Sequence, residues 1–511
     1  MRHGPSLAIV TGGAALLVAH ALYLRGLFDG NALDDAYISY RYAENLARGL
    51  GLVFNAGERV EGYSNFLWTV LLAPVAAQGG DLVLVSQILG VGCSVGALVL
   101  AVVALRRVLG VHQVLSEAFL VLLLATSGYL AAWSVGGLEG PLYGLLLLAA
   151  WVAFASRRVL MTAVLLSALA LLRPEGIVVA IVAAGLAAWV ALRQPQERRL
   201  WVLVLVVAGV VLVYEAWRFA FYGPHLWPNA VRAKVGWSLA QLGRGGEYVA
   251  GRFLLPYAPL LLPLVFVRSW REAEPGVRQA LGLGFALFVG CLALIVGAGG
   301  DWSQGRFFAP LVPLGGTLAV GWASQTWARR PPRGVARVLL AVGALAFLVG
   351  AAITSTSREA KIRRQYAEVD SERIAIGRWF AQHMPPDAVV AVHAAGQIPY
   401  YSRLPTHDML GLNDPHIAAL RVAGFGRGDP GHEKFDPEYT LRTVRPGIIV
   451  EGRRIPGLVR HALYRSEYYP FAGFWKHHEI AVRRELAVRL GLLPGTAPQA
   501  APGGVDSPRR P

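Results

Sequence analysis

Long apolar runs, separated by short polar intervals, dominate residues 1–354. A run of about 18 or more apolar residues is the length that a helix needs to cross a bilayer. Residues 66–77 are apolar but too few to cross, so we expect a helix that lies at the membrane interface or dips into it. The pattern predicts eleven full spans, at residues 6–27, 82–105, 115–133, 139–156, 159–172, 175–192, 200–222, 253–268, 279–298, 306–323 and 337–354.

Basic residues cluster after alternate spans along the chain. The clusters are Arg106 with Arg107, Arg157 with Arg158, Arg193 with Arg198 and Arg199, Arg268 with Arg271 and Arg278, and Arg329 with Arg330, Arg333 and Arg337. With a cytoplasmic N-terminus, eleven spans place every cluster in a cytoplasmic loop, as the positive-inside rule requires, whereas a twelfth span at 66–77 would move them outside. We therefore expect a multi-pass membrane protein with a cytoplasmic N-terminus and an extracytoplasmic C-terminal part.

The character of the chain changes after the last apolar run. Residues 1–354 form the predicted membrane domain, with a first outer loop at 28–81, and residues 355–492 have ordinary soluble composition. Helical periodicity at 371–383 and β-rich runs at 388–394 and 447–450 predict a small extracytoplasmic α/β domain. Residues 493–511, which are rich in Pro, Gly, Ala and Arg, predict a disordered tail.

Composition and charge agree with a membrane protein. Hydrophobic residues make up 55% of the chain and charged residues only 16%, against roughly 25% charged residues in soluble proteins. The net charge of +16 lies in clusters between apolar runs, which favours membrane topology over nucleic-acid binding. Cys93 and Cys291 both fall inside apolar runs, so we expect inert thiols and neither a disulfide framework nor a cysteine metal cluster.

The most informative polar interval is residues 34–68, which follows the first span and opens on Asp34 and Asp35. One aspartate is enough to cap a helix, and two charges at the membrane interface cost desolvation unless they have partners. A sugar transferase needs a carboxylate that takes the proton of an acceptor hydroxyl, or that holds a divalent cation against a phosphate. We predict that Asp34 or Asp35 is catalytic, with either no cofactor or a Mg or Mn ion held by both.

Other polar residues of the predicted outer loops are candidates for substrate binding. Arginine and lysine at this face could hold a lipid phosphate, although arginine at a helix end also snorkels to the interface. The candidates for the donor phosphate are Arg306, Lys234, Arg232 and Arg173.

Aromatic, amide and acidic side chains could contact the sugar or the acceptor, although an aromatic belt, helix caps, turns and an Arg173–Glu175 ion pair explain many of them equally well. His393, His407 and His416 match no metal-site spacing. The candidate sugar or acceptor contacts are Tyr37, Tyr40, Arg41, Asn65, Trp68, Glu139, Glu175, Asn229, Asp301, Trp302, Asp408, Asn413 and Asp414.

Seven motifs in order carry a resemblance to a known family. They are DDAYISYRY, GLGLVFNAGERVEGYSNFLW, GGLEGP, RPEG, LWPNAVRAK, GGDWSQGRF and DMLGLND. From Asp34 to about His416, the chain resembles the terminal β-arabinofuranosyltransferases of actinobacterial cell walls, within the GT-C superfamily of polyprenyl-phosphate-sugar-dependent transferases. The resemblance implies a GT-C membrane fold with its active site on the outer face of the bacterial cytoplasmic (inner) membrane, a polyprenyl-phosphate sugar donor and an acidic catalytic motif at Asp34 and Asp35. The apolar runs set the number of transmembrane helices in this fold at about eleven.

These observations predict an integral-membrane glycosyltransferase. It would move arabinofuranose, or another pentose or hexose, from a polyprenyl-phosphate donor to a cell-envelope glycan or glycolipid, without nucleic acid as a partner. The rival hypothesis is a transporter or a non-catalytic envelope scaffold of the same fold. A transporter usually places its ionisable residues near mid-bilayer, whereas here they fall towards the outer ends of the spans. The sugar, the acceptor and the choice between inversion and retention stay open.

Overall fold

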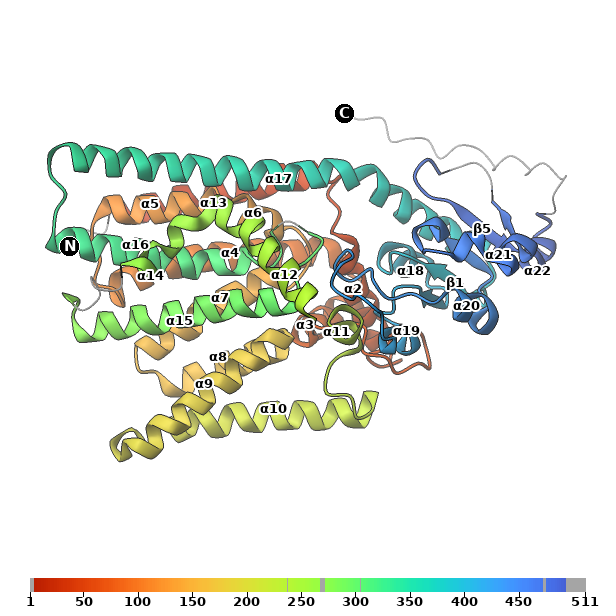
Figure 1. Cartoon of the computed structure of the whole chain (residues 1–511), viewed down its shortest axis with the longest axis horizontal. Coiled ribbons are helices and arrows are strands. Elements are labelled where there is room, and N and C mark those ends of the chain that lie inside the picture. Colours follow the sequence, from red (N-terminus) through yellow and green to blue (C-terminus); the bar gives the residue numbers. More distant parts are fainter. Residues whose placement is uncertain (1–3, 237, 267–271, 304, 472–474, 493–511) are drawn as a thin grey trace.

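A bundle of long helices with a smaller domain at one end forms the molecule (Figure 1). The computed structural model describes residues 4–236, 238–266, 272–303, 305–471 and 475–492. The predicted disordered tail at 493–511 lies outside the described residues, as does most of the basic loop around Arg268.

Helices occupy all eleven predicted spans. Seven of the described helices are long and apolar enough to cross a membrane, or eight if α5 and α6, which meet at 54°, form one span. The count of eleven crossings stays a prediction, since several of these helices are short. The bundle comprises α1 (Gly4–Gly26), α4 (Leu82–Arg107), α5 (Val114–Ala125), α6 (Gly128–Ser134), α7 (Gly140–Ala155), α8 (Val159–Leu172), α9 (Pro174–Arg193), α10 (Leu200–Tyr222), α12 (Leu239–Tyr248), α13 (Leu255–Tyr257), α14 (Leu262–Val265), α15 (Pro275–Ala298), α16 (Val312–Arg329) and α17 (Gly334–His383).

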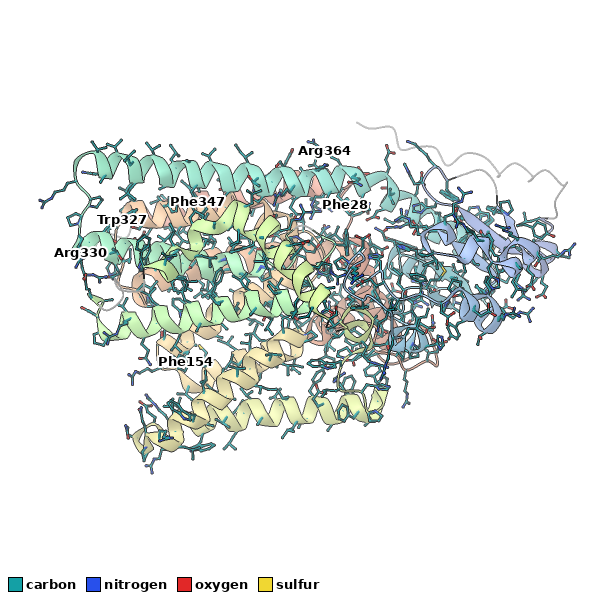
Figure 2. All side chains as sticks on the ribbon, in the orientation of Figure 1. Phe28, Phe154, Trp327, Arg330, Phe347 and Arg364 are labelled. Atoms are coloured by element: carbon teal, nitrogen blue, oxygen red, sulfur yellow. The ribbon has the colours of Figure 1, made fainter. Side chains whose placement is uncertain are left out.

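The outward faces of these helices carry large apolar side chains. Leu192, Leu212 and Val338 expose 71%, 69% and 61% of their surfaces, which suits contact with lipid tails and would promote aggregation in water. The loops that join α9 to α10 and α16 to α17 lie at the end of the bundle away from the small domain (Figure 1). Arg330 lies at that far end, and Arg364 lies toward the small domain (Figure 2). The protein is therefore a multi-pass membrane protein.

Helix α17 connects the bundle to the C-terminal domain without a break. Its 50 residues extend over about 75 Å at 1.5 Å per residue. The change in composition predicted after residue 354 occurs within this one helix, where exposed apolar residues up to Ile353 give way to charged residues. Its last turns, predicted as a helix at 371–383, carry Ile376 and Phe380 into the core of the C-terminal domain.

The C-terminal domain is built on a five-stranded sheet with the strand order β2-β1-β3-β5-β4. β1 pairs in parallel with β2 and β3, and β5 pairs antiparallel with β3 and β4. The predicted strands at 388–394 and 447–450 are β1 and β3, so the predicted α/β character is confirmed. The strands are β1 (Val390–Val392), β2 (Thr406–Asp408), β3 (Ile448–Val450), β4 (Tyr468–Pro470) and β5 (Ile480–Arg483), and the helices include α18 (Gln397–Ser402), α19 (Pro415–Ala419), α20 (Pro437–Tyr439), α21 (Ala462–Glu467) and α22 (Arg484–Arg489).

The first outer loop lies between the bundle and the C-terminal domain. It contains α2 (Asp34–Ala47) and α3 (Phe66–Ala77), and α11 (Asn229–Lys234) lies beside it (Figure 1). Ile38 and Tyr42 of α2 share one hydrophobic core with Phe380 of α17 and Val390 of β1. Burial of side chains of this size contributes about 1.5–3 kcal/mol each, so the loop and the domain stabilise one another.

Candidate active site at the junction of the bundle and the C-terminal domain

An ion pair between Asp35 and Arg306 lies at the centre of the junction. The Arg306 Nη1 atom is 2.6 Å from Asp35 Oδ2 and 3.5 Å from Asp301 Oδ2. The Asp35 side chain is 19% exposed, against 13% for Arg306 and 7% for Asp301. Asp35 of α2 and Asp301, which precedes Arg306 in the same loop, thus hold one guanidinium at the start of α2, and the pair keeps limited access to solvent.

Helix capping does not explain the two aspartates. The residue before α2 is Leu33, which makes no side-chain capping hydrogen bond, and Asp34 and Asp35 both lie in the first turn. The carboxylates face other elements instead, Asp34 toward the C-terminal domain and Asp35 toward the bundle. Their charge still suits the positive end of the α2 dipole.

The environment of Asp35 favours its charged form. Burial by itself raises the pKa of Asp35, but Lys234 and Arg306 outweigh burial and hold the pKa of that carboxyl below its ordinary value. No hydrogen bond or ion pair to another described residue engages the Lys234 ammonium, and the backbone at Gly431 packs along its side chain. Lys234 is therefore a cation near Asp35 that is free to bind an anion.

The Asp34 carboxylate connects α2 to the backbone of the C-terminal domain and is not a second carboxylate that is open to substrate. Its two oxygens accept the backbone N–H groups of Gly396 and Gln397 at 3.0 and 2.9 Å. Burial raises the pKa of Asp34, and Arg373 and the Gln397 N–H offset the increase only in part. Gly396 is required here, because a Cβ at this position would lie 1.9 Å from the Asp34 carbonyl oxygen.

A buried polar chain borders the Asp35 site on the bundle side. Glu139 accepts a hydrogen bond from Arg173 at 2.5 Å and one from the Asn65 amide at 2.7 Å. The second Arg173 amino group binds Glu175 at 2.6 Å, and Asn65 in turn accepts the Ser39 hydroxyl at 3.0 Å. The Arg173–Glu175 ion pair considered from the sequence is present, and Glu139 makes it a triad. Arg173 is thus fully paired in this state.

Aromatic rings lie against the two arginines of the site, Trp133 against Arg306 and Phe307 against Arg173. The Arg306 Cζ atom lies 5.9 Å from the centroid of Trp133, and Phe307, the next residue, lies 5.2 Å from the Arg173 guanidinium. The Trp133 indole donates to Glu359 of α17 at 3.3 Å. The Arg306 Nε–H is buried and has no hydrogen-bond partner, so this guanidinium has unused donor capacity. Trp302, which is half-buried, packs at 6.0 Å on Tyr366 of α17, and its contact with substrate stays a prediction.

Arg41 connects the first outer loop to the C-terminal domain. Its guanidinium, on a residue only 7% exposed, donates to five acceptors. They are the carbonyls of Phe54, Pro399 and Leu404, the Asn55 Oδ1 atom and the Thr406 hydroxyl. The predicted role in substrate binding does not explain these five hydrogen bonds, so we assign Arg41 to the junction between the first outer loop and the C-terminal domain.

Four other predicted contacts make structural hydrogen bonds in or to the loop at 408–417 of the C-terminal domain. The Asn229 amide donates to the carbonyls of Gly411 and Leu412 at 2.9 Å. Asp408 accepts the backbone and side-chain N–H groups of Asn413 at 2.9 and 3.1 Å. Asp414 caps α19 through the Ile417 N–H at 3.0 Å. These residues shape the loop that faces α11.

Three predicted sugar contacts are buried rings. Tyr37 and Tyr40 are 0% exposed and Trp68 is 1% exposed. Tyr40 bonds the Ser86 hydroxyl at 2.6 Å, and the Trp68 indole donates to the Gly137 carbonyl at 3.1 Å. Tyr37 packs edge-on against Tyr40 at 5.2 Å. Since no face of these rings is open, we reassign them from sugar binding to packing.

The four predicted phosphate ligands do not gather at one point. Arg306 and Lys234 lie by Asp35 and Arg173 borders them, whereas Arg232 lines a separate pocket of about 40 Å³ with Glu61, Arg218 and His225, among others. Arg232 and Lys234 are two positions apart on α11, which directs their side chains away from each other. Arg218 pairs with Glu215 and also with Glu61, the latter at 2.6 Å.

The histidines of the C-terminal domain do not form a metal centre. His407 pairs with Asp414 at 3.2 Å and His416 with Asp436 at 2.9 Å. Burial lowers the pKa of His393 to about 3, and its ring stacks on His432 at 5.2 Å. Among the residues that the structure describes, no three His, Cys, Asp or Glu side chains gather in a way that could hold a metal ion.

Two neighbours of the site escaped the sequence reasoning. His432 acts on the charge of Asp35 from the C-terminal domain, and Trp133 lies against Arg306 from α6. His432 stands in an ordinary Pro-Gly turn, and Trp133 stands inside an apolar run. Neither position carries a local signal in the sequence, because each residue is far from Asp35 along the chain and only the tertiary fold brings the two close.

Comparisons with known proteins place this geometry in context. A family model described as "Domain of unknown function (DUF8728)" matches residues 360–489. Over 377 residues the chain is 28% identical to a terminal beta-(1->2)-arabinofuranosyltransferase of Corynebacterium glutamicum, covering 63% of this chain and 53% of the relative. The chain therefore spans about half the length of the curated relative that it matches.

Solved structures show the fold. A crystal structure of ArnT from Cupriavidus metallidurans bound to undecaprenyl phosphate aligns with a TM-score of 0.51 and 15% identity, covering 92% of this chain and 98% of that one. The apo oligosaccharyltransferase of Archaeoglobus fulgidus aligns with a TM-score of 0.54 and 10% identity, covering 88% and 69%. The resemblance is confirmed: the chain has the membrane fold of the GT-C glycosyltransferases and is similar in sequence to a terminal arabinofuranosyltransferase.

Proposed function

We propose that the protein is a membrane glycosyltransferase that takes a sugar from a polyprenyl-phosphate donor. The observation that carries this proposal is the Asp35–Arg306 pair, with Asp301 and the free Lys234 ammonium beside it. A carboxylate next to two cations supplies a base and a phosphate site in one place. The undecaprenyl phosphate in the ArnT structure supports a lipid-linked phosphate as the ligand class.

The donor phosphate would bind Lys234 and Arg306. Lys234 has no described partner, and Arg306 has a buried Nε–H without an acceptor, so both can donate to phosphate oxygens without breaking all existing bonds. Guanidinium and ammonium groups make short charge-assisted hydrogen bonds with phosphate. Because phosphate leaves with an additional negative charge, these donors bind the leaving group more strongly than the intact donor, which lowers the barrier.

Asp35 would accept the proton of the acceptor hydroxyl. The acceptor oxygen forms a bond to the anomeric carbon, the bond from that carbon to the phosphate oxygen breaks, and the hydroxyl proton passes to Asp35. The products are a glycoside and polyprenyl phosphate. Arg306 lowers the pKa of Asp35 in the free protein, and a phosphate that draws Arg306 away would make the carboxylate more basic when the substrate is bound.

Arg173, Glu139 and Asn65 would position this machinery. These three residues directly precede α9, α7 and α3, and their hydrogen bonds form a chain that ends at Ser39 of α2. They hold the start of α2, and hence Asp35, against the bundle. Glu175 completes the charge balance of Arg173.

The relative from Corynebacterium glutamicum supports arabinofuranose as the sugar, within a broader class of pentoses and hexoses. The acceptor would be an envelope glycan or glycolipid that reaches the site beside the C-terminal domain, on the outer face of the cytoplasmic membrane.

The residues present suit a divalent cation poorly. Asp34 and Asp35 do not form a joint ligand pair, because Asp34 accepts two backbone N–H groups and Asp35 accepts Arg306. Asp35 and Asp301 would be the carboxylates nearest to a Mg or Mn ion, with Arg306 already between them. We therefore derive no step that needs a cation.

The test is the release of polyprenyl phosphate by purified protein that is given a panel of polyprenyl-phosphate sugars and an envelope-glycan acceptor. We expect release with one donor, lost in Asp35→Asn and strongly reduced in Arg306→Gln. Release that is unchanged in both variants would leave a transferase but reject this site. If folded wild-type protein releases no polyprenyl phosphate from any donor, with Mg and Mn present, the transferase proposal fails. That result would favour a scaffold or a transporter instead.

A further inference from the structure

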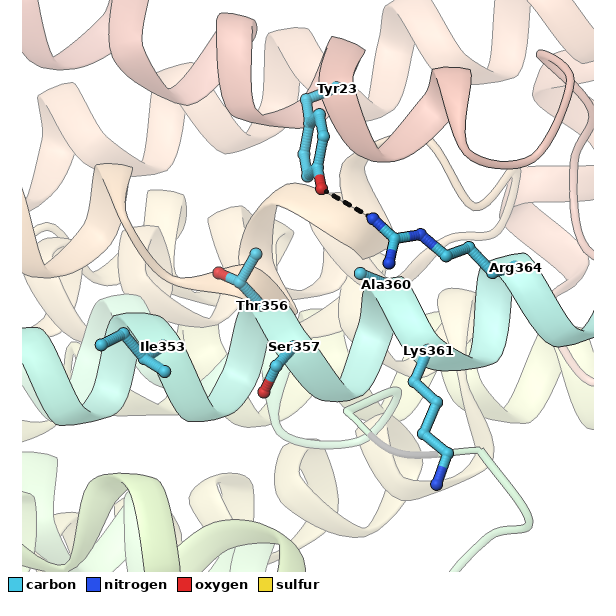
Figure 3. Close-up of a pocket in the computed structure, with 7 residues that line it drawn as sticks. All are labelled: Tyr23, Ile353, Thr356, Ser357, Ala360, Lys361 and Arg364. Atoms are coloured by element: carbon cyan, nitrogen blue, oxygen red, sulfur yellow. Dashed lines mark hydrogen bonds between the residues drawn. The ribbon is translucent and has the colours of Figure 1, made fainter.

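A groove of about 500 Å³ opens between α1 and α17, and it shares no residue with the Asp35 site (Figure 3). Six of its lining residues come from α17 at spacings of three and one, which places them on one face of the helix. Tyr23 contributes from α1. The lining residues are Tyr23, Ile353, Thr356, Ser357, Ala360, Lys361 and Arg364. The buried Ala360 leaves the middle of this face low, with longer side chains around it.

One end of the groove carries uncompensated positive charge. Lys361 and Arg364 are exposed, and Arg364 Nη2 donates to the Tyr23 hydroxyl at 3.3 Å. No carboxylate of the described residues forms an ion pair with either cation. Nearby acids of α17 are used elsewhere, since Glu359 accepts the Trp133 indole and Glu368 pairs with Lys476 at 3.3 Å.

The other end of the groove continues into the lipid-facing surface. Ile353 is 63% exposed, and Val349 and Leu345 before it on α17 are 47% and 62% exposed. Leu22, next to Tyr23 on α1, is 55% exposed. The groove therefore opens directly onto apolar surface that faces lipid tails.

The side chains along this face of α17 change from apolar to polar to charged in a fixed order. Apolar Ile353 comes first, the hydroxyls of Thr356 and Ser357 follow, and the two cations come last. At 1.5 Å per residue, the eleven steps from Ile353 to Arg364 cover about 16 Å. This is the order of acyl chain, ester region and phosphate in a phospholipid that stands in a leaflet.

We propose that the groove binds an anionic phospholipid of the leaflet next to the C-terminal domain. Its phosphate lies at the end of the groove that Lys361 and Arg364 flank, its ester region lies near Ser357 and its acyl chain lies along Ile353. Figure 3 shows Arg364 extending toward Tyr23 from one side of α17, and Ser357 and Lys361 extending from the other side, so the two cations flank this end of the groove without converging on one point. The site concerns lipid binding alone and is independent of the proposed transfer reaction.

The experiment is native mass spectrometry of the full-length protein in detergent, titrated with phosphatidylglycerol or with phosphatidylcholine. Each cation close to an anionic lipid surface strengthens binding about fivefold, so Lys361→Gln with Arg364→Gln should weaken phosphatidylglycerol binding about 25-fold. Binding of zwitterionic phosphatidylcholine should be weak in the wild type and unchanged in the variant. Lys476→Gln is the matched control, because it removes one exposed cation outside the groove.

A third variant separates the groove from general charge attraction. Ser357→Trp keeps both cations and fills the middle of the groove, and it should also weaken phosphatidylglycerol binding. Thermal unfolding confirms that each variant is folded.

Four results would overturn the proposal. Three of them are phosphatidylglycerol binding that the double variant leaves unchanged, equal binding of the two lipids by the wild type, and normal binding by Ser357→Trp. Displacement of the lipid by millimolar inorganic phosphate would assign the cations to a soluble anion and would overturn the lipid assignment as well.

Discussion

The separation of Asp34 from Asp35 gives the sharpest test of the junction. The two residues are adjacent in sequence, but Asp34 holds the backbone of α18 and Asp35 faces Arg306. We expect Asp35→Asn to lower turnover by about 10²–10⁴-fold, the usual contribution of a general base. The affinity for the donor should stay the same or improve, because Arg306 loses a competing carboxylate and keeps Asp301.

Asp34→Asn should act on stability rather than on turnover. The amide keeps one oxygen for one of the two backbone N–H groups and turns an NH₂ toward the other, which leaves a buried donor unpaired at a cost of about 1–3 kcal/mol. In a protein of this size we expect a fall in the midpoint of thermal unfolding of about 1–3 °C. Turnover per folded molecule should change less than about tenfold, since the general base is intact.

The assay measures the initial rate of polyprenyl phosphate release, normalised to folded protein by size-exclusion chromatography and thermal unfolding. Glu44→Gln is the matched control. It removes a carboxylate from the same helix, α2, and the Arg48 side chain that pairs with this carboxylate is exposed. The reasoning is refuted if Asp34→Asn abolishes release while the protein stays folded and Asp35→Asn retains it. Equal loss in both variants would show that the two carboxylates act together.

Four further predictions follow from the contacts. Lys234→Gln should raise the KM for the donor about 10–100-fold, the value of one charge-assisted hydrogen bond, with Arg48→Gln as an exposed control in the same steady-state assay. Arg41→Gln should destabilise the junction by about 3–5 kcal/mol, seen as faster limited proteolysis between bundle and domain; an unchanged cleavage pattern would contradict this role. Glu139→Gln should lower kcat/KM about tenfold and the thermal midpoint together, because it leaves a buried arginine underpaired; loss of activity at full stability would argue for direct substrate contact instead. The pKa of Asp35 lies below its ordinary value of 3.8 in the folded protein. The stability and activity that depend on the charged Asp35 are therefore present above pH 3.8, and they are lost only as the pH falls through the lower, folded-state pKa. A fall of kcat/KM on the acidic side that begins near neutral pH would contradict this.

Much of the fold was predictable because local patterns determine it. Each of the eleven predicted spans falls on helix, because a long apolar run has only one way to satisfy its backbone in lipid. The β-rich runs at 388–394 and 447–450 became β1 and β3 for the same local reason. The segment at 253–268 was harder to predict as a span, since Pro256, Pro259 and Pro263 divide it into short helical pieces.

The candidate site was predictable in part. Motifs at the predicted outer ends of spans indicated Asp35, Arg306, Asp301 and Lys234 as site residues, and the structure brings all four together. The same reasoning also named Tyr37 and Arg41, which are buried. A sequence shows that an aromatic or charged residue lies near the interface, but it does not show which neighbour occupies its face or its hydrogen bonds.

By itself, the sequence determined the membrane character, the positions of the helices, the α/β character of the C-terminal domain and the loops in which polar chemistry gathers. These features depend on the hydropathy and periodicity of neighbouring residues, which are local properties of the chain. Only the tertiary structure decided that Asp34 holds a backbone while Asp35 meets Arg306, 271 residues away. Contacts across such separations depend on the packing of whole helices and domains, so no local pattern of residues encodes them.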